Sequence, residues 1–229
     1  VFKRVAKTSA HIITPSKFTK QDLVSFTGIS PEKVTVTYEA AETRTESLRR
    51  YDLPFTQYLL YVGQQSDYKN IRRLAAAHQN LLISNPELGL VLVGKLNASA
   101  TANKTYFEDK KYKNILFTDF VEDDQLNDIY NHATAYIFPS LMEGFGLPGL
   151  EAMTHGIPLV SSNATCLPEI YGDAAHYFDP KNIGDMAESI AEVLTDQHLR
   201  ETLIKNGYNQ IKKYSWRNMA EQTLDVYTH

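Results

Sequence analysis

The chain contains the apolar run Ala135-Tyr136-Ile137-Phe138-Pro139 and, shortly after it, the segment Glu143-Gly144-Phe145-Gly146-Leu147-Pro148-Gly149-Leu150-Glu151. The first run predicts a buried strand, and the second predicts a turn that leads through Pro148 into a helix stopped by Gly156. The start of such a helix offers free N–H groups and the positive end of a dipole, and glycines let the backbone approach a ligand closely. The pattern therefore favours a phosphate site.

Two carboxylates flank this turn. Glu143 stands at the end of the strand and Glu151 about one turn into the helix, so both side chains can point into one crevice. Carboxylates accept hydrogen bonds from sugar hydroxyls, so the pair suits a phosphate that carries hydroxyl-rich groups. The alternative is an ordinary glycine-rich turn with two solvated acids.

Apolar runs alternate with helical patterns along the chain from Tyr58 onward. This rhythm predicts an α/β fold with a doubly wound parallel sheet of the Rossmann type. Ligands of such sheets bind at the carboxyl ends of the strands. After Pro180 the apolar spacing is helical only, which predicts a helical C-terminal tail. The expected strands are residues 58–63, 90–94, 115–120, 135–138, 157–161 and 175–178, and the expected helices are residues 70–84, 101–112, 123–132, 150–155, 167–171 and 216–227.

A longer pattern surrounds the turn. It consists of Phe138-Pro139-Ser140, then Glu143-Gly144-Phe145-Gly146-Leu147-Pro148, then Glu151-Ala152-Met153 and Gly156-Ile157-Pro158. This pattern resembles the signature of retaining GT-B glycosyltransferases of glycosyltransferase family 4 (glycosyl transferases group 1). The match continues in register through residues 162–180 and covers nearly the whole chain. It implies the C-terminal, donor-binding domain of a GT-B enzyme, which transfers a sugar from a nucleoside-diphosphate sugar.

The resemblance also divides the chain into four parts. Residues 1–40 resemble the last β-α-β segment of the family's N-terminal domain, and residues 41–56 are then an interdomain linker. Residues 57–214 are the expected donor-binding domain, and residues 215–229 the expected helix that crosses back towards the N-terminal domain. Because a complete enzyme of this kind has most of a further Rossmann-like domain, we expect the chain to be a fragment that lacks most of the acceptor domain.

The loop after the first strand of the donor-binding domain carries further candidates. Gly63, Lys69 and Asn70 match the family, whereas Gln64 and Tyr68 stand where arginine is common, which leaves the site with fewer cations than usual. By resemblance, Lys69 contacts the diphosphate and offsets the charge that builds on the leaving group. A solvated lysine at the start of a helix is the alternative.

The resemblance assigns roles around the acidic turn as well. Glu143 contacts hydroxyls of the transferred sugar as a ligand rather than as a general base, and Glu151 binds the ribose hydroxyls. Backbone groups near Val121 hold the nucleobase. The acceptor attacks from the face that the phosphate leaves, without a firmly established enzyme nucleophile. The catalytic candidates are Lys69 and Glu143, and the donor-binding candidates are Gly63, Lys69, Asn70, Val121, Glu143, Gly144, Phe145, Gly146, Leu147 and Glu151.

The composition disfavours other classes of protein. A formal net charge of −4 argues against a general nucleic-acid-binding protein. No apolar run approaches the ~20 residues that a membrane-spanning helix needs. The single Cys166 cannot form an internal disulfide, and its place before Leu167 and Pro168 suits a small residue rather than a nucleophile. The seven histidines show no metal-ligand spacing, and the resemblance implies metal independence and no cofactor beyond a GDP- or UDP-linked donor.

A basic and aromatic cluster near the C-terminus has two interpretations. It could touch an anionic membrane surface, or it could combine a solvated basic face with core aromatics. We therefore expect a cytoplasmic protein, with peripheral contact at the inner face of the membrane as the open alternative. The cluster consists of Lys205, Lys212, Lys213 and Arg217 with Tyr208, Tyr214 and Trp216.

Within the family, similarity over residues 162–180 favours a mannosyltransferase that acts on a surface polysaccharide or a lipid-linked glycan. Two alternatives of other classes stay open: a non-catalytic nucleotide-sugar-binding module, and a sugar-nucleotide epimerase of the same architecture. A Rossmann dehydrogenase is disfavoured, because no Gly-x-Gly-x-x-Gly pattern follows the first strand.

Overall fold

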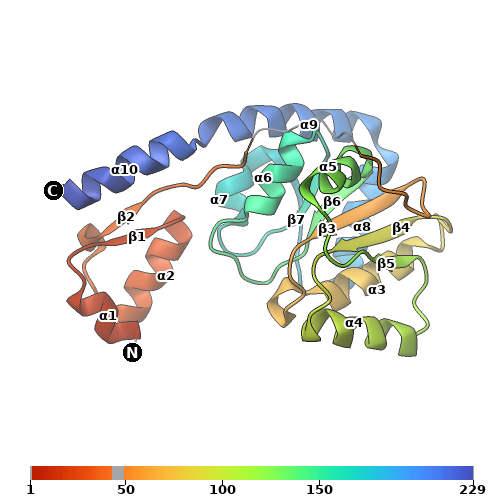
Figure 1. Cartoon of the computed structure of the whole chain (residues 1–229), viewed down its shortest axis with the longest axis horizontal. Helices are drawn as coiled ribbons and strands as arrows, with labels where there is room; N and C mark the ends of the chain where they lie inside the picture. The colour runs from red at the N-terminus through yellow and green to blue at the C-terminus, as the bar shows by residue number, and fades with distance from the viewer. Residues whose placement is uncertain (1, 43–48, 229) are drawn as a thin grey trace.

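The computed structural model describes residues 2–42 and 49–228, so the middle of the expected linker, residues 43–48, lies outside the described residues. Six parallel strands form the main sheet in the order β5-β4-β3-β6-β7-β8 (Figure 1). This arrangement confirms the expected doubly wound, Rossmann-like α/β fold. The strands are β3 (Tyr58–Val62), β4 (Gly89–Val93), β5 (Ile115–Phe117), β6 (Ala135–Phe138), β7 (Leu159–Ser162) and β8 (Ala175–Phe178).

Helices cover both faces of this sheet, which is why its central strands are apolar throughout. Neighbouring residues of one strand point to opposite faces, so Leu60 joins a core with Leu150 of α6 while Leu59 joins a second core with Leu74 of α3. The helices are α3 (Ile71–Leu81), α4 (Ala98–Asp109), α5 (Asp123–His132), α6 (Leu147–Thr154), α7 (Leu167–Tyr171), α8 (Ile183–Thr195) and α9 (Gln197–Gln210).

The strand order reverses at β3, which lies between β4 and β6. β3 pairs with β4 over five residue pairs and with β6 through Leu59–Ala135 and Leu60–Tyr136. The chain leaves β3 towards β4 and β5 and then returns to β6, so the connections after β3 and β6 turn away from each other. Such a switch point opens a crevice at the carboxyl ends of the two strands.

Residues 2–40 form a smaller unit beside this domain. They are the described part of the expected residues 1–40 and are called segment 1–40. β1 (Ile12–Thr14) and β2 (Val34–Val36) pair in parallel around α2 (Lys17–Thr27), with a short turn η1 (Pro31–Lys33) before β2. This β-α-β order was expected, whereas α1 (Phe2–Thr8) was not. The last helix, α10 (Trp216–Thr228), runs back over β1 and β2 (Figure 1).

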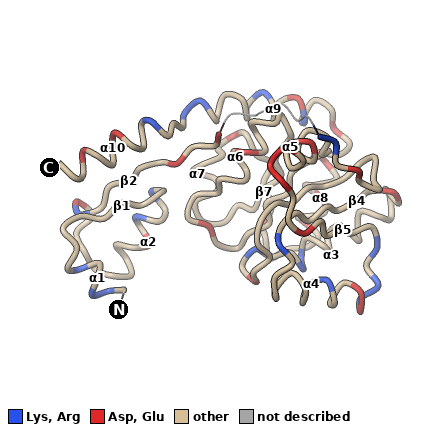
Figure 2. The backbone as a smooth tube through the Cα atoms, viewed as in Figure 1, with Lys and Arg blue, Asp and Glu red and all other residues tan. Residues whose placement is uncertain are grey.

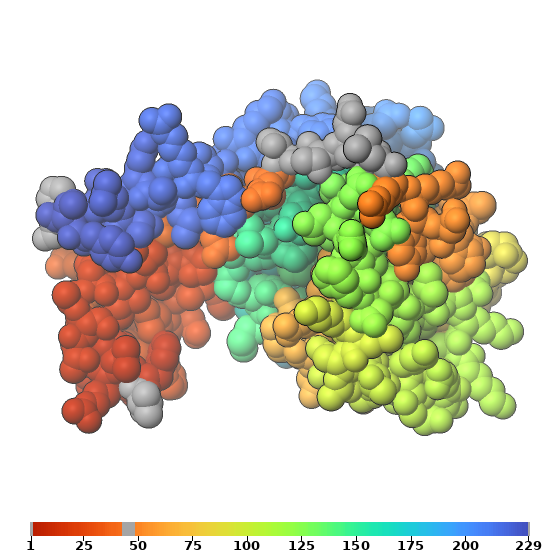
Figure 3. Space-filling model, in the orientation of Figure 1, coloured from red at the N-terminus to blue at the C-terminus, as the bar shows by residue number. Residues whose placement is uncertain are grey.

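The space-filling view shows the same division on the surface. Segment 1–40 and α10 form one lobe, and the six-stranded domain forms the other (Figure 3). A notch lies between the lobes in this view, on the side of α3 and α4 (Figure 3).

Some predicted boundaries were wrong by about three residues, for reasons that are local. The helix expected from Thr101 begins at Ala98, because the side chain of Asn97 caps it by accepting from the N–H of Ala100 at 3.0 Å. The strand expected to reach Phe120 ends at Phe117, because Asp119 takes a left-handed backbone conformation with a φ of 61°.

Charges of both signs are interspersed over the fold (Figure 2). In the basic cluster near the C-terminus, Arg217 pairs with Glu221 at 2.9 Å, and Lys213 donates to the side chain of Gln210. Tyr214 packs inward against the ring of Phe145. Among the described helices, none is both long and apolar enough to cross a membrane.

Acid should weaken the fold through one buried histidine, His78 of α3. Its Nε2 lies 3.0 Å from the carbonyl oxygen of Leu88, and its Nδ1 lies 3.1 Å from the amide of Gln79, so the neutral ring is satisfied. Burial lowers the pKa of His78 from 6.5 to about 4. Because the unfolded state then binds the proton more tightly, the unfolding free energy should fall by roughly 3 kcal/mol between pH 6.5 and pH 4.

Urea unfolding across that pH range measures this loss. The variant His78→Gln removes the titrating ring and should flatten the slope of the unfolding free energy against pH. An equal slope in the variant and the wild type would contradict the assignment to His78.

Candidate active site

Lys69 and Glu143 meet at the switch point of the sheet. Lys69 ends the 3-10 turn η2 (Asp67–Lys69) that follows β3, and Glu143 lies in the loop that follows β6. The Lys69 Nζ and the Glu143 Oε1 are 2.6 Å apart, and the two side chains are only 14% and 13% exposed. Two residues that the sequence placed at different strand ends thus form one ion pair in the place where such folds bind ligands.

Asn70 fixes the position of this lysine. Its Nδ2 donates to the carbonyl oxygens of Pro139 at 3.0 Å and Pro180 at 2.7 Å, and its Oδ1 accepts from Arg73 at 2.9 Å. The side chain therefore ties the turn before α3 to the segments that follow β6 and β8. Both hydrogens of the Asn70 amide are used within the protein. A bound ligand could therefore contact Asn70 only through the remaining lone pair of its Oδ1 or through its backbone.

The loop of residues 143–146, called the acidic loop below, presents a row of backbone donors. The N–H groups of Gly144, Phe145, Gly146 and Leu147 have no hydrogen-bond acceptor within residues 2–42 and 49–228. Leu147 is the first residue of α6, and Gly146 before it has a φ of 103°. Unpaired N–H groups at the positive end of a helix are suited to bind an anion such as phosphate.

Gly146 at the end of this loop and Gly149 in α6 make room for Tyr171. A Cβ atom on Gly149 would lie 2.4 Å from the Tyr171 ring and hydroxyl, and one on Gly146 would lie 2.4 Å from the same hydroxyl. The sequence predicted that these glycines admit a ligand, and the structure gives them a packing role. At Gly144 a Cβ would meet only ordinary contacts, the nearest at 3.7 Å.

Gly149→Ala should therefore destabilise the protein while Gly144→Ala should not. Because the added methyl of Gly149→Ala overlaps the Tyr171 ring in the core, the expected loss is about 1–3 kcal/mol of unfolding free energy. Chemical denaturation of the two variants compares the effects directly. Equal stability of both variants would show that Tyr171 does not fill the space above α6.

Glu151 lines a separate cavity of about 450 Å³ between α5 and α6. Residues 40–42 and Trp216 close this cavity, and Glu143 is not among its lining residues. The Tyr130 hydroxyl donates to the Glu151 Oε2 at 3.3 Å. Burial raises the pKa of Glu151 above its usual 4.5, and the charge of Glu42 adds to the shift, whereas the Tyr130 hydrogen bond opposes it.

Tyr130 has a second contact that the sequence did not reveal. Its ring stacks on the ring of His155, with centroids 4.7 Å apart and an interplanar angle of 8°. The His155 Nδ1 lies 2.8 Å from the Asn131 Oδ1, which fixes the orientation of the imidazole. Tyr130 is buried in the core, and its hydroxyl also orients the carboxylate of Glu151.

The remaining candidates lie at neighbouring strand ends. Gly63 follows β3 with a φ of 141°, and its carbonyl oxygen would lie 2.4 Å from a Cβ on Gly94, so these two glycines let the ends of β3 and β4 approach. Val121 is 7% exposed and belongs to the core, so only its backbone is available to a ligand. The ring of Tyr68, at a position where the family often has arginine, lies 5.2 Å from the Lys69 Nζ.

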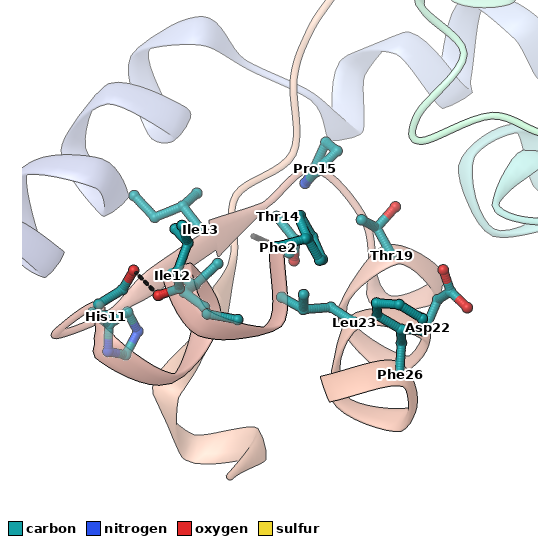
Figure 4. A pocket seen from close by; sticks show the side chains of 13 residues that line it. Phe2, His11, Ile12, Ile13, Thr14, Pro15, Thr19, Asp22, Leu23 and Phe26 are labelled. Atoms are coloured by element: carbon teal, nitrogen blue, oxygen red, sulfur yellow. Dashed lines mark hydrogen bonds between the residues drawn. The ribbon is translucent and has the colours of Figure 1, made fainter. Parts of the chain in front are cut away.

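A different cavity, of about 450 Å³, lies within segment 1–40. Its lining is mostly apolar, and Figure 4 shows Phe2, Leu23 and Phe26 around it. Among the described residues that line it there is no lysine or arginine side chain to offset a phosphate. We therefore place the candidate site at the switch point of the large sheet.

Comparisons with known proteins identify the family of this chain. The family model of Glycosyl transferases group 1 matches residues 50–210. The O-antigen chain mannosyltransferase B of Escherichia coli is 32% identical over 227 residues, which are 94% of this chain and 60% of that protein. The chain therefore spans about 60% of the length of this relative.

Solved structures show the same fold. The sucrose-phosphate synthase of Thermosynechococcus elongatus superposes with a TM-score of 0.81 and 22% identity over 99% of this chain and 59% of that one. The HepE protein of Anabaena, solved in complex with UDP and glucose, gives a TM-score of 0.80 and 16% identity over 98% of this chain and 64% of that one. The fold is that of the C-terminal domain of GT-B glycosyltransferases. Since the family model also covers well over half of the residues, the chain belongs to the family Glycosyl transferases group 1.

Proposed function

We propose that the protein transfers a sugar from a nucleoside-diphosphate sugar to a glycan or lipid-linked acceptor, with retention of configuration as in glycosyltransferase family 4. Residues 57–214 bind the donor. Segment 1–40 belongs to the domain that contacts the acceptor, and α10 connects the two. The observation that carries the proposal is the Lys69–Glu143 pair, which lies at the switch point next to the unpaired N–H groups of the acidic loop.

Each part of the donor has a matching group. The N–H groups of residues 144–147 and the Lys69 ammonium bind the diphosphate and offset the charge of the leaving group. Glu143 accepts hydrogen bonds from hydroxyls of the transferred sugar, and Glu151, in the neighbouring cavity, accepts them from the ribose. Backbone groups near Val121 hold the base.

The reaction breaks the bond between the anomeric carbon and the phosphate oxygen. The acceptor oxygen then bonds to that carbon on the same face, and its proton passes to the departing phosphate. In this scheme the protein binds and orients the donor and neutralises its charge. Lys69 acts at the leaving group, and Glu143 holds the sugar. No metal ion is needed for these roles, because Lys69 and the α6 N-terminus supply the positive charge.

Mannose is the proposed sugar, and GDP or UDP the proposed carrier. Support for mannose comes from the 32% identity to a mannosyltransferase. A cytoplasmic location with peripheral membrane contact through the basic cluster near the C-terminus stays a prediction.

Calorimetry with GDP-, UDP- and ADP-sugars, using the full-length protein that contains this chain, tests the proposal. One GDP- or UDP-sugar should bind, and transfer to an acceptor should follow. Binding without transfer would favour a non-catalytic module. Conversion of the nucleotide sugar into another nucleotide sugar when no acceptor is added would favour an epimerase. A protein that binds none of the nucleotide sugars in the panel would contradict the proposal.

A further inference from the structure

We propose that Ser16, Cys166 and Tyr171 are positioning residues for the transfer reaction. They hold the carbonyl groups of the acidic loop so that its N–H groups face the donor diphosphate. This inference rests on the proposed function and extends it to three residues that do not touch the donor themselves.

Side-chain donors lie within hydrogen-bonding distance of all four carbonyl groups of the acidic loop, and the one thiol hydrogen of Cys166 is shared between two of them. The Tyr171 hydroxyl donates to the carbonyl oxygen of Gly146 at 2.6 Å, and the Ser16 hydroxyl donates to that of Gly144 at 2.7 Å. The Cys166 thiol lies 3.3 Å from the carbonyl oxygen of Glu143 and 3.4 Å from that of Phe145. A row of consecutive carbonyls bound by side chains differs from an ordinary solvated turn, where water satisfies these groups.

The three donors stay protonated, as this role requires. Burial raises the pKa of the Cys166 thiol to about 12, so it remains a thiol near neutral pH. Burial also raises the pKa of Tyr171 well above 10.0. Ser16 and Cys166 are fully buried, so water does not compete for their hydrogens.

The geometry of the peptide group links these contacts to the site. In a trans peptide the C=O and the following N–H point in opposite directions. The Gly144 carbonyl points at Ser16, so the N–H of Phe145 points away from Ser16. The Gly146 carbonyl points at Tyr171, which in the same way sets the N–H of Leu147. These N–H groups have no acceptor in the described parts of the chain.

Ser16 comes from the other lobe of the molecule. It caps α2 of segment 1–40, 128 residues from Gly144 in the sequence. Thr19 of the same helix also donates to the Gly144 carbonyl, at 3.2 Å. In Figure 4, Thr19 and Pro15 lie where β1 leads into α2. The orientation of the acidic loop therefore depends on the position of segment 1–40.

Glu169 of α7 holds the two lobes in this arrangement. Its carboxylate accepts from the backbone N–H groups of Lys17 at 2.8 Å and Phe18 at 2.9 Å, which are otherwise unpaired at the start of α2. The Tyr38 hydroxyl donates to the same carboxylate at 2.9 Å. The contact between Ser16 and the acidic loop is thus part of a larger interface and not an isolated hydrogen bond.

Tyr171→Phe in the full-length protein tests the inference, because it removes one hydrogen bond and keeps the ring under Gly146. Tyr177→Phe is the matched control, since the Tyr177 hydroxyl donates at 2.8 Å to the carbonyl of Gly172, outside the acidic loop. The affinities for GDP and UDP, and for guanosine and uridine, are measured by calorimetry. We expect Tyr171→Phe to weaken the binding of the diphosphate by up to about 10-fold, the upper end of what one neutral hydrogen bond contributes.

The nucleosides distinguish positioning from general damage. Guanosine or uridine should bind equally to the wild type, Tyr171→Phe and Tyr177→Phe, because neither nucleoside reaches the acidic loop. Ser16→Ala should repeat the loss of diphosphate affinity if Tyr171→Phe does not fold. Unchanged diphosphate affinity in both variants, or an equal loss for nucleoside and diphosphate, would overturn the inference. A wild type that binds neither GDP nor UDP would instead refute the proposed function.

Discussion

Lys69→Met is expected to lower kcat for sugar transfer by about 100- to 1,000-fold, the usual effect of removing one group that stabilises charge in a transition state. The Lys69 ammonium is the cation that the structure places at the switch point, 2.6 Å from Glu143. The negative charge of the departing diphosphate then lacks its partner. Donor affinity should fall less than kcat, because the N–H groups of the acidic loop still bind the phosphates. Steady-state kinetics with saturating donor measures the effect.

The control for this prediction is the double variant Lys69→Met, Glu143→Gln. The single change leaves the carboxylate of Glu143 buried without its partner, which destabilises the fold for reasons unrelated to catalysis. The double variant removes both charges and should recover stability without recovering kcat. Recovery of activity in the double variant would mean that the loss came from instability and not from the missing ammonium.

Glu151→Ala is expected to raise the dissociation constant of the donor about 10- to 100-fold, because a buried carboxylate that accepts from ribose hydroxyls contributes strongly to binding. Tyr130→Phe keeps the carboxylate and removes only its hydrogen bond from tyrosine, so its effect on affinity should be smaller. Calorimetry with the nucleoside diphosphate measures both. Equal affinity of Glu151→Ala and the wild type would place the ribose elsewhere.

Glu151 should also make the binding of the donor depend on pH. Burial raises the pKa of Glu151 above 4.5, so this carboxyl becomes protonated at a higher pH than an exposed glutamate. The protonated form loses part of its capacity to accept hydrogen bonds from ribose. Donor affinity should therefore fall as the pH is lowered, and this fall should be absent in Glu151→Gln, which does not titrate.

The strands and helices of the larger domain were predictable because their signals are local. The run at β6 and the pattern at α5 predicted residues 135–138 and 123–132, which are the observed bounds. Apolar residues and turn residues decide such elements within a few positions. The proximity of Lys69 and Glu143 could also be predicted, because two loops at neighbouring strand ends of a parallel sheet lie close together.

The contacts that hold the acidic loop in position could not be predicted from the sequence. Ser16 and Gly144 are 128 residues apart, and only the packing of segment 1–40 on the larger domain brings them together. The ring of Tyr171 explains why positions 146 and 149 require glycine, yet no local pattern connects these positions. Long-range contacts of this kind depend on the final arrangement of helices, about which a single sequence holds no direct signal.

A crystal structure of the full-length protein with GDP or UDP is the most direct measurement of the central claim. The β-phosphate should lie within hydrogen-bonding distance of the N–H groups of Phe145 to Leu147 and of the Lys69 ammonium, and the ribose should contact Glu151. A diphosphate bound in another cavity, with those N–H groups still unpaired, would contradict the account.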